Sequence, residues 1–386
     1  MKRIYMDNAA TTRVSAPVVE AMLPYLTEVY GNPSSVHGFG RDAKKALENA
    51  RRQVAAALKC ESGEVYFTGC GTESDNWAIR GAAYAKKAKG NHIITSSVEH
   101  HAVLHTCQQL EREGFEVTYL PVDEFGRVSV EDVEKAIRPE TTLITIMAAN
   151  NEIGTLMPIE EIAQVAKAHK ILFHTDAVQA IGSMHFDVKA MGIDMLSLSG
   201  HKFHAPKGVG VLYIRKGVRL ERLIQGGAQE KTQRAGTENM ASIVGLGKAI
   251  EIAEANVEQH NETLIPLRDH MIERILKEIP YSRLNGHPTE RLPGNVNVSI
   301  QYIEGEALLL SLDLKGIAAS SGSACTSGSL DPSHVLLAIG LPHGIAHGSL
   351  RFSLSEENTM EDVDYAVDEL KVIVERLRAM SPLYNR

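Results

Sequence analysis

The alternation of two hydrophobic patterns between residues 15 and 247 constrains the fold more than any other feature. Segments with helical spacing occupy residues 15–31, 41–59 and 158–170, and the first of them opens on a serine and ends near a glycine. Short apolar or β-branched runs recur along the same stretch: EVYFT, HIITSS, FEVTYL, TLITIM, ILFHT, MLSLS and GVGVLYI. Strands that alternate with helices form crossover units. The sequence therefore predicts an α/β fold with a mainly parallel sheet.

A different pattern extends from about residue 239 to the C-terminus. A long helical stretch begins near Asn239, the runs NVNVSI and RFSLS predict strands, and residues 362–377 predict a closing helix. This order of elements is typical of a small α+β domain. We predict a large α/β domain over residues 15–258 and a small α+β domain formed by residues 1–14 and 259–386.

Charge and hydropathy argue against two classes of protein. The net charge of the 386 residues is −8 at pH 7, which disfavours a nucleic-acid surface. No apolar run approaches the roughly 18 residues of a membrane span. The N-terminal segment MKRIYMDNAATT also lacks the apolar core of a signal peptide. We expect a cytoplasmic protein with no nucleic-acid or membrane partner.

The four cysteines lie far apart and form no C-x-x-C pair, so they indicate neither a disulfide framework nor a structural metal site. Sixteen histidines are present without an H-E-x-x-H motif, and we expect no catalytic metal. Cys325 stands among small side chains only, in SSGSACTSGSL, residues 320–330. It is either another small residue in a tight turn or a reactive thiol on a loop.

Ligands of open α/β sheets bind at the carboxyl ends of the strands, and two predicted strand ends carry polar groups. In VYFTGCGTESDNWAI, a turn containing Gly69 and Gly71 leads into a helix near Thr72, whose free N–H groups suit a phosphate. An ordinary capped helix is the alternative. In HIITSSVEHHAVL, Glu99 and His100 follow the strand. His100 can exchange protons or stack on a flat ligand, and a solvated loop is the alternative.

Two further strand ends carry a carboxylate and a lysine. Asp176 follows an apolar run, where a carboxylate needs a cationic partner, and Gln179 can face the same site. Lys202 follows a strand in SGHK and can act as a nucleophile toward carbonyls, whereas Lys207 is interpreted as a solvated loop residue. A phosphate cradle, a stacking histidine, a carboxylate and an imine-forming lysine together are what pyridoxal 5'-phosphate requires.

These motifs resemble, nearly end to end, those of the pyridoxal-phosphate-dependent cysteine desulfurases of the NifS/IscS type. SGHK is shared with the wider class of class-V aminotransferases, and its combination with GSACTSG is far more specific. The matching segments are DNAATT, YGNPSSVHGFG, GTESDNWAI, VEHHAVL, ANNEIGT, HTDAVQAIG, SGHKFHAPKGVGVLYIR, RAGTEN, LPGNVNVS, EGEALLL, SSGSACTSGSL and HGSLRFSLS. The resemblance implies fold type I of the pyridoxal-phosphate-dependent transferases, a homodimer, and a small domain that carries the Cys325 loop.

The resemblance also implies a role for each matching residue. Lys202 would hold the cofactor as a Schiff base, and His100 would stack on its ring and move protons. Asp176 would pair with the pyridinium nitrogen, Gln179 would bond the ring hydroxyl, and Cys325 would accept the substrate's sulfur. The remaining assignments are Gly71, Thr72, Ser199, His201 and the partner subunit's Thr237 for the cofactor phosphate, Asn151 for cofactor and substrate, and Arg351 for the substrate carboxylate.

The implied activity is that of a cysteine desulfurase, a sulfurtransferase that converts L-cysteine to L-alanine. The cofactor withdraws electrons and weakens the bond between β-carbon and sulfur, and Cys325 takes the sulfur as a persulfide. The sulfur would then pass to an acceptor, such as an iron–sulfur scaffold protein, for iron–sulfur cluster or other sulfur-cofactor biosynthesis. A carrier of this kind belongs on a loop that can move between the site and a docking surface.

The sequence departs from the family pattern at two positions, and two other activities are alternatives. Ala9 stands where a second Asn is common, so we expect a substrate contact to be missing or supplied elsewhere. Gly69 replaces the usual Ser, and Cys70 is interpreted as a packing residue. A class-V aminotransferase on the same fold, which would not need Cys325, and a selenocysteine lyase are the alternatives. A non-catalytic metal or sulfur scaffold is disfavoured by the cysteine spacing.

Overall fold

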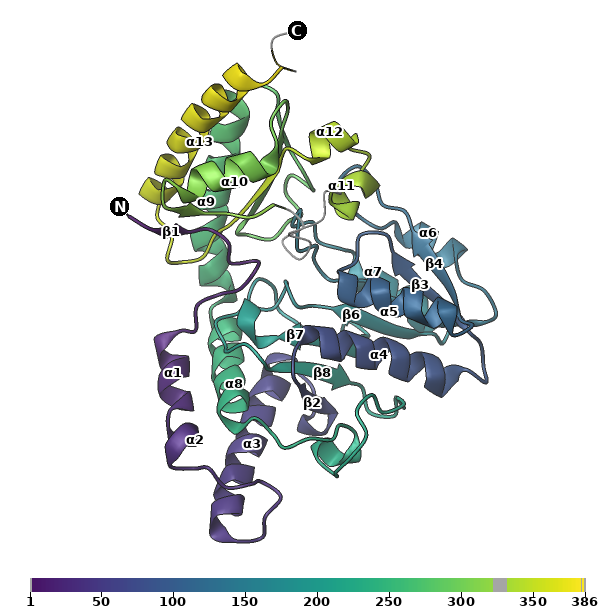
Figure 1. The fold of residues 1–386 in the computed structure, drawn as a ribbon. Helices are drawn as coiled ribbons and strands as arrows, with labels where there is room; N and C mark the ends of the chain where they lie inside the picture. Colours follow the sequence, from purple (N-terminus) through teal and green to yellow (C-terminus); the bar gives the residue numbers. More distant parts are fainter. Residues whose placement is uncertain (1, 322–331, 383, 385–386) are drawn as a thin grey trace.

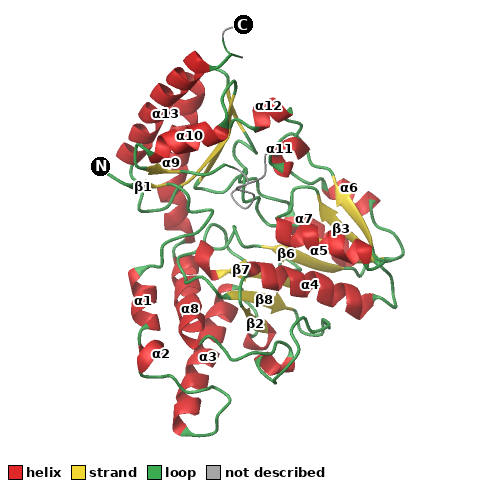
Figure 2. Ribbon diagram, in the orientation of Figure 1, coloured by secondary structure: helices red, strands yellow, loops and turns green. Residues whose placement is uncertain are grey.

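A seven-stranded sheet forms the centre of the larger part of the molecule in the computed structural model, which describes residues 2–321, 332–382 and 384 (Figure 1; Figure 2). Every neighbouring pair of strands is parallel except the two pairs made by β8. In spatial order the strands are β2 (Val65–Thr68), β8 (Gly210–Ile214), β7 (Met195–Ser199), β6 (Leu172–Asp176), β5 (Thr141–Thr145), β3 (His92–Ser96) and β4 (Glu116–Leu120). The predicted α/β fold with a mainly parallel sheet is confirmed.

Helices cover both faces of this sheet, so its strands are buried on both sides. Helices α4 (Gly71–Lys86) and α5 (His101–Arg112) share an apolar cluster with Ile93, Leu143 and Met195. Helices α3 (Gly38–Ala57), α7 (Ile159–Ala168) and α8 (Met240–Ala255) share another with Ile94, Ile144 and Leu196. Consecutive strand residues thus face opposite clusters, which explains why the runs in the sequence are continuously apolar.

The smaller part is built on an antiparallel sheet of β12 (Ser349–Ser353), β10 (Asn295–Ile300) and β9 (Ser282–Leu284). Strand β1 (Ile4–Tyr5) pairs in parallel with β11 (Ile317–Ala318), which brings the start of the chain beside its C-terminal third. Helices α9 (Val257–Glu278), α10 (Gly305–Asp313) and α13 (Met360–Met380) pack around these strands (Figure 1). The domain bounds predicted from the sequence stay predictions.

Several shorter elements complete the fold. Residues 15–31, expected to form one helix, form α1 (Ala16–Met22) and α2 (Pro24–Thr27), because Pro24 has no N–H to continue the first helix. The others are α6 (Val130–Lys135), α11 (His334–Ala338), α12 (His343–Ala346), η1 (Ser62–Glu64), η2 (Gly200–Lys202) and η3 (Glu230–Thr232). No helix among the described residues is long and apolar enough to cross a membrane.

A buried ion pair fixes the long loop between β8 and α8 to the edge of the large sheet. Arg51 of α3 donates two hydrogen bonds to the carboxylate of Glu230, at 2.7 and 2.8 Å, and a third to the carbonyl of Val65 at 2.7 Å. The same carboxylate accepts the N–H of Phe67 at 2.9 Å. Both charged side chains are almost fully buried. Three consecutive residues with positive φ, beginning at Glu230, are therefore held against the sheet in a conformation that is unfavourable by itself.

Replacement of Arg51 by methionine should lower the free energy of unfolding by about 3 to 5 kcal/mol, because it leaves Glu230 as a buried charge without its cation. Arg52, the next residue, is exposed and gives a matched control, and Arg52→Met should change stability by at most about 0.5 kcal/mol. Denaturant unfolding of both variants measures the difference. Similar losses in the two variants would contradict this account.

Candidate active site

A cavity of about 360 Å³ lies at the carboxyl edge of the large sheet. It collects side chains from the ends of β2, β3, β5, β6 and β7 and one from β12 of the smaller part. Ten of the predicted site residues line it: Gly71, Thr72, His100, Asn151, Asp176, Gln179, Ser199, His201, Lys202 and Arg351. Residues far apart in the sequence therefore meet around one space large enough for a small ligand.

Two predicted site residues are not among those that line this cavity. Thr237 is exposed in the loop before α8, and its expected role in the partner subunit's site stays a prediction. Cys325 lies outside the described residues, so its expected role also stays a prediction.

Lys202 sits in the turn that follows β7 and is held by the N-terminal segment. Its Nζ donates hydrogen bonds to the carbonyl oxygens of Ala9 and Ala10, the latter at 2.9 Å. Gln179 Nε2 also donates to the Ala9 carbonyl, at 3.0 Å, and the Ala9 N–H donates to Ser353 Oγ at 2.8 Å. These contacts involve only the backbone of Ala9. They therefore do not depend on the side chain at this position, where the family pattern commonly has Asn.

Asp176 forms the floor of the cavity at the end of β6. It is almost fully buried, and its Oδ1 accepts the N–H of Val178 at 2.9 Å. Burial raises the pKa of Asp176 to about 6, although the Val178 hydrogen bond and the charge of Lys202 act in the opposite direction. A carboxylate in this setting is stabilised by a cation placed over it.

The phosphate end of the site is formed by the start of α4. A Cβ on Gly71 would lie 2.7 Å from Val178 Cγ2 and 3.3 Å from Ser199 Cβ, so only glycine lets the helix begin this close to β7. The first N–H groups of a helix lack partners within the helix and suit an anion. With Asp176 for a ring nitrogen and Lys202 for an aldehyde, the donor set fits pyridoxal 5'-phosphate.

Two of the four histidines that line the cavity, His100 and His201, are neutral at physiological pH. Burial, and then the charge of Lys202, lowers the pKa of each to about 4. His100 Nδ1 accepts the N–H of Ala102 at 3.1 Å, which places the imidazole proton on Nε2. His100 lines the cavity, and its Nε2–H is therefore a hydrogen-bond donor of the site. Glu99 before it is fully buried, not in a solvated loop, and Oε1 and Oε2 each accept the Met147 N–H at 3.1 Å.

Arg351 of β12 supplies the cation suited to a substrate carboxylate. Its Nη1 donates to the backbone carbonyl of Asn151 at 2.8 Å, and its Nη2 lies 3.2 Å from Asp7 Oδ1. Its Nε is buried and has no hydrogen-bond partner among the residues that the structure describes. Burial raises the pKa of Asp7, while the charges of Arg351 and Lys202 lower it. The guanidinium thus retains a free donor for an anion.

Several residues line the cavity that the sequence did not predict. Asp75 lies four positions after Gly71 on α4, a helical spacing that could have revealed it. His334 comes from α11, and no local pattern in the sequence connects it with the strand ends. Cys70, interpreted as a packing residue, also lines the cavity. The other such residues are Ala10, His101, Met147, Ala149, Glu152 and Val178.

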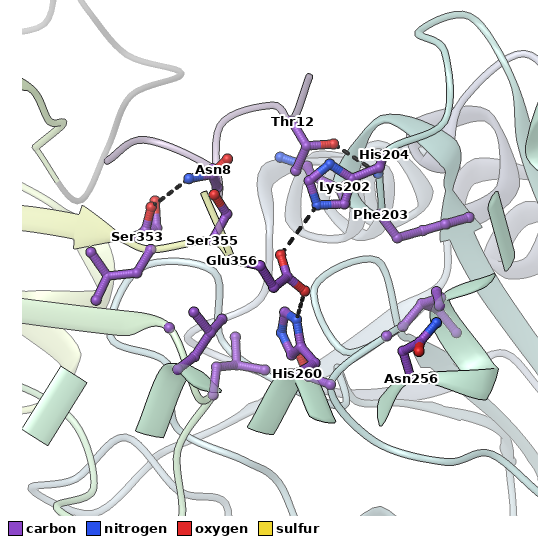
Figure 3. A pocket seen from close by; sticks show the side chains of 18 of the residues that line it. Asn8, Thr12, Lys202, Phe203, His204, Asn256, His260, Ser353, Ser355 and Glu356 are labelled. Atoms are coloured by element: carbon purple, nitrogen blue, oxygen red, sulfur yellow. Dashed lines mark hydrogen bonds and ion pairs between the residues drawn. The ribbon is translucent and has the colours of Figure 1, made fainter. Parts of the chain in front are cut away.

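A second cavity, of about 590 Å³, lies on the other side of the Lys202 turn, between α8, α9 and the loop after β12 (Figure 3). Glu356 bonds His260 of α9, and its Oε2 lies 3.8 Å from His204 Nε2. The His204 N–H donates to Thr12 Oγ1 at 2.8 Å. The loop that follows Lys202 is therefore joined to the smaller part on this side as well.

Comparison with known proteins identifies the family. Residues 4–366 match the model of the class-V aminotransferases. The chain belongs to this family. It is 62% identical over 382 residues to cysteine desulfurase IscS of Methanosarcina thermophila, covering 99% of this chain and 94% of the relative. It is 58% identical over 386 residues to cysteine desulfurase IscS of Clostridium botulinum, covering 100% and 97%.

Solved structures agree with this placement. A NifS-like protein superposes with a TM-score of 0.92 at 40% identity, covering 97% of this chain and 100% of that one. The protein SspA in complex with cysteine superposes with a TM-score of 0.81 at 41% identity, covering 92% and 99%. The chain is a pyridoxal-phosphate-dependent enzyme of the cysteine desulfurase group, with fold type I as expected. Within the described ranges, no group of three or more histidine, cysteine or acidic side chains could hold a metal ion.

The cofactor-free protein should lose stability as the pH rises through about 6, the pKa of Asp176. The pKa of Asp176 is higher in the folded than in the unfolded chain. Its favourable contribution to the free energy of unfolding is therefore complete below the unfolded-state pKa of about 4 and is lost above about 6. Asp176→Asn should therefore stabilise the cofactor-free protein at neutral pH by about 3 kcal/mol and have little effect near pH 4. Thermal unfolding across this range, with exposed Asp42→Asn as control, measures the effect. A pH-independent difference would contradict it.

Proposed function

We propose that the chain converts L-cysteine to L-alanine and takes the substrate's sulfur onto Cys325 as a persulfide. The observation that carries this proposal is the meeting of Lys202, Asp176 and Arg351 around one cavity in a chain of this family. When bound, pyridoxal phosphate supplies an electron sink that weakens the bond between the β-carbon and the sulfur. Lys202 would bind the cofactor, and Asp176 would hold a proton on the ring nitrogen through its negative charge.

Arg351 orients the substrate. Its planar guanidinium is buried, and its Nε is unpartnered within the described part of the chain, so a carboxylate can take two parallel hydrogen bonds there. Asp7 keeps the guanidinium in place from the other side, 3.2 Å from Nη2. A fixed carboxylate leaves the thiol end of L-cysteine free to reach toward the sulfur acceptor. His100, with its proton on Nε2, can donate and then recover that proton at the reacting groups.

Cys325 is the cysteine best suited to accept the sulfur. Burial and the charge of Glu64 raise the pKa of Cys60 to about 12, and burial raises the pKa of Cys107 well above its usual value, which disfavours both thiolates. Cys70 lines the cavity and is the competing candidate. The transfer is balanced: a sulfur–sulfur bond forms as the carbon–sulfur bond breaks, and the electron pair left on carbon takes a proton, giving alanine.

The finer parts of the proposal concern assembly and the fate of the sulfur. We propose a homodimer in which Thr237 reaches the partner subunit's phosphate site. Its exposure in a loop fixed by the Arg51–Glu230 pair supports this role. Exposed apolar side chains before and at the start of α3, such as Tyr30 and Phe39, support a contact between copies. The persulfide would pass to an acceptor protein, such as an iron–sulfur scaffold.

Cys325→Ser should keep the cofactor and bind L-cysteine but release almost no alanine, because a hydroxyl is a poor nucleophile toward sulfur. After incubation of the wild type with L-cysteine and no reductant, mass spectrometry should find one extra sulfur on the peptide that contains Cys325. Cys60→Ser, remote from the cavity, is the control and should still form alanine. An extra sulfur on Cys70 instead, or transfer of the amino group to a keto acid, would refute the assignment.

Arg351→Lys should raise KM for L-cysteine by about 10- to 100-fold, because an ammonium cannot reproduce the two parallel hydrogen bonds of the guanidinium. The visible absorption of the bound cofactor should change little, since Arg351 acts on the substrate. Arg112→Lys, at an exposed position on α5, is the matched control. Steady-state kinetics with both variants test the assignment, and an unchanged KM in Arg351→Lys would place the carboxylate site elsewhere.

A further inference from the structure

Three buried carboxyl groups line the cavity: Asp176, Asp75 and Glu152, of which Glu152 accepts a hydrogen bond from Ser333 Oγ. Asp75 lies on α4, is 1% exposed and lines the same cavity. Helix α4 packs against β5, β6 and β7, so Asp75 faces the strands from which the floor is built. Neither the family motifs nor the proposed function gives this residue a role.

A buried hydrogen-bond network leads to Asp75 from the centre of the sheet. His174 Nδ1 lies 2.8 Å from Thr145 Oγ1, and its Nε2 lies 2.9 Å from Ser197 Oγ. Ser197, which is paired with Asp176 in the sheet register, also hydrogen-bonds Asp75. The Oδ1 atom of Asp75 lies 3.8 Å from His174 Nε2 and has no hydrogen-bond partner in the part of the chain described.

The charged groups around Asp75 are mostly acidic. Asp176 on β6, Glu99 after β3 and Cys70 at the start of α4 are the ionisable groups whose negative charge would raise the pKa of Asp75, with Asp176 the largest of the three. Burial raises the pKa of Glu99 to about 8, so at neutral pH Asp176 is the main anion among them. His174 cannot compensate, because burial lowers its pKa to about 3 and leaves it neutral. The charge of Lys202 acts on Asp176. Asp75 and Asp176 thus present two carboxyl groups to one ring cation, and a second buried anion without a partner would be strongly destabilising.

We infer that Asp75 is a positioning residue that stays a neutral carboxylic acid, with its proton on Oδ1, so that Asp176 is the single anion beneath the cofactor ring. This inference rests on the proposed function only in taking the cavity as the cofactor site. Burial and the neighbouring Asp176 raise the pKa of Asp75 well above its usual value, in agreement with the geometry. Two carboxyl groups in one site generally divide into one that ionises and one that keeps its proton.

Infrared difference spectroscopy tests the proton directly. At about pH 9, above the pKa of about 8 of Glu99, the holoenzyme should show the C=O band of a buried carboxylic acid. Glu152, another buried carboxyl group of the lining whose pKa burial raises, can contribute to this region, so the Asp75 signal is taken from the difference between wild type and Asp75→Asn. That difference should show one carboxylic acid band, and it should persist when both proteins also carry Asp176→Asn or the exposed control Asp42→Asn. Identical C=O bands in wild type and Asp75→Asn would overturn the inference.

A pH titration of the visible absorption of the bound cofactor gives a second readout. Asp75→Asn, a neutral isostere, should shift the midpoint by less than about 0.5 unit, whereas loss of an anion near the ring should shift it by about 1 to 3 units. Asp176→Asn should show the larger shift, and the same shift in Asp75→Asn would overturn the inference. The inference would also be overturned if Asp75→Asn failed to fold while Ser197→Ala folded. That result would mean that a neutral side chain of the same shape cannot replace Asp75.

The two proposals can fail independently. If the cavity does not bind the cofactor, the wild type shows no visible absorption and Lys202→Ala changes nothing. The carboxylic acid band of Asp75 is still measurable in that case, because the inference requires it in the cofactor-free protein as well.

Discussion

The parallel direction of the strands is the constraint on which the rest of the structure depends. Six of the seven strands of the large sheet run the same way, so their carboxyl ends share one edge. Parallel strands need crossover connections, which are helical here except between β6 and β7, and each returns the chain to the opposite edge before the next strand begins. Polar residues placed after β2, β3, β6 and β7 must therefore meet, whatever their distance in sequence. Strand β8, the next strand after the Lys202 turn, is the one that runs in the reverse direction.

The electrostatics of the site are incomplete within the chain alone. Asp75 and Asp176 line the cavity, Glu99 is buried behind the lining residue Met147, whose N–H it accepts, and burial raises the pKa of each. The histidines that could balance them are neutral, because burial also lowers their pKa values. Such a site is less stable empty than filled by a cation, since a ligand that binds only the folded state adds its binding free energy to stability. The same buried carboxyl groups thus favour the binding of a cationic ring and lower the stability of the protein without it.

The sequence predicted what local patterns encode. A glycine turn before a helix, a carboxylate after an apolar run and a lysine after a strand singled out Gly71, Asp176 and Lys202, which line one cavity in the structure. The apolar spacing alone predicted one helix across Pro24, whereas the missing N–H of that proline, away from the first turn where Pro17 is accommodated, indicates the break that the structure has. The sequence could not predict the contact of His334 with the cavity or the bonds of Glu356, which depend on how the two parts of the molecule pack. Asp75 was missed for another reason: a carboxylate on a helix is usually a surface residue, and only its spacing of four positions from Gly71 indicates the cavity.

The contacts of the N-terminal segment have a consequence for the order in which the enzyme is made. The carbonyls of Ala9 and Ala10 hold Lys202, yet this segment is itself held by β11 and by Ser353, through the pairing of β1 and the hydrogen bond from Asn8. On the ribosome the first residues emerge early and must wait until nearly the whole chain has been synthesised before they can dock. A nascent chain that has not yet reached Ser353 therefore lacks the contacts that hold the N-terminal segment beside Lys202, and these hydrogen bonds of the lysine form late in synthesis.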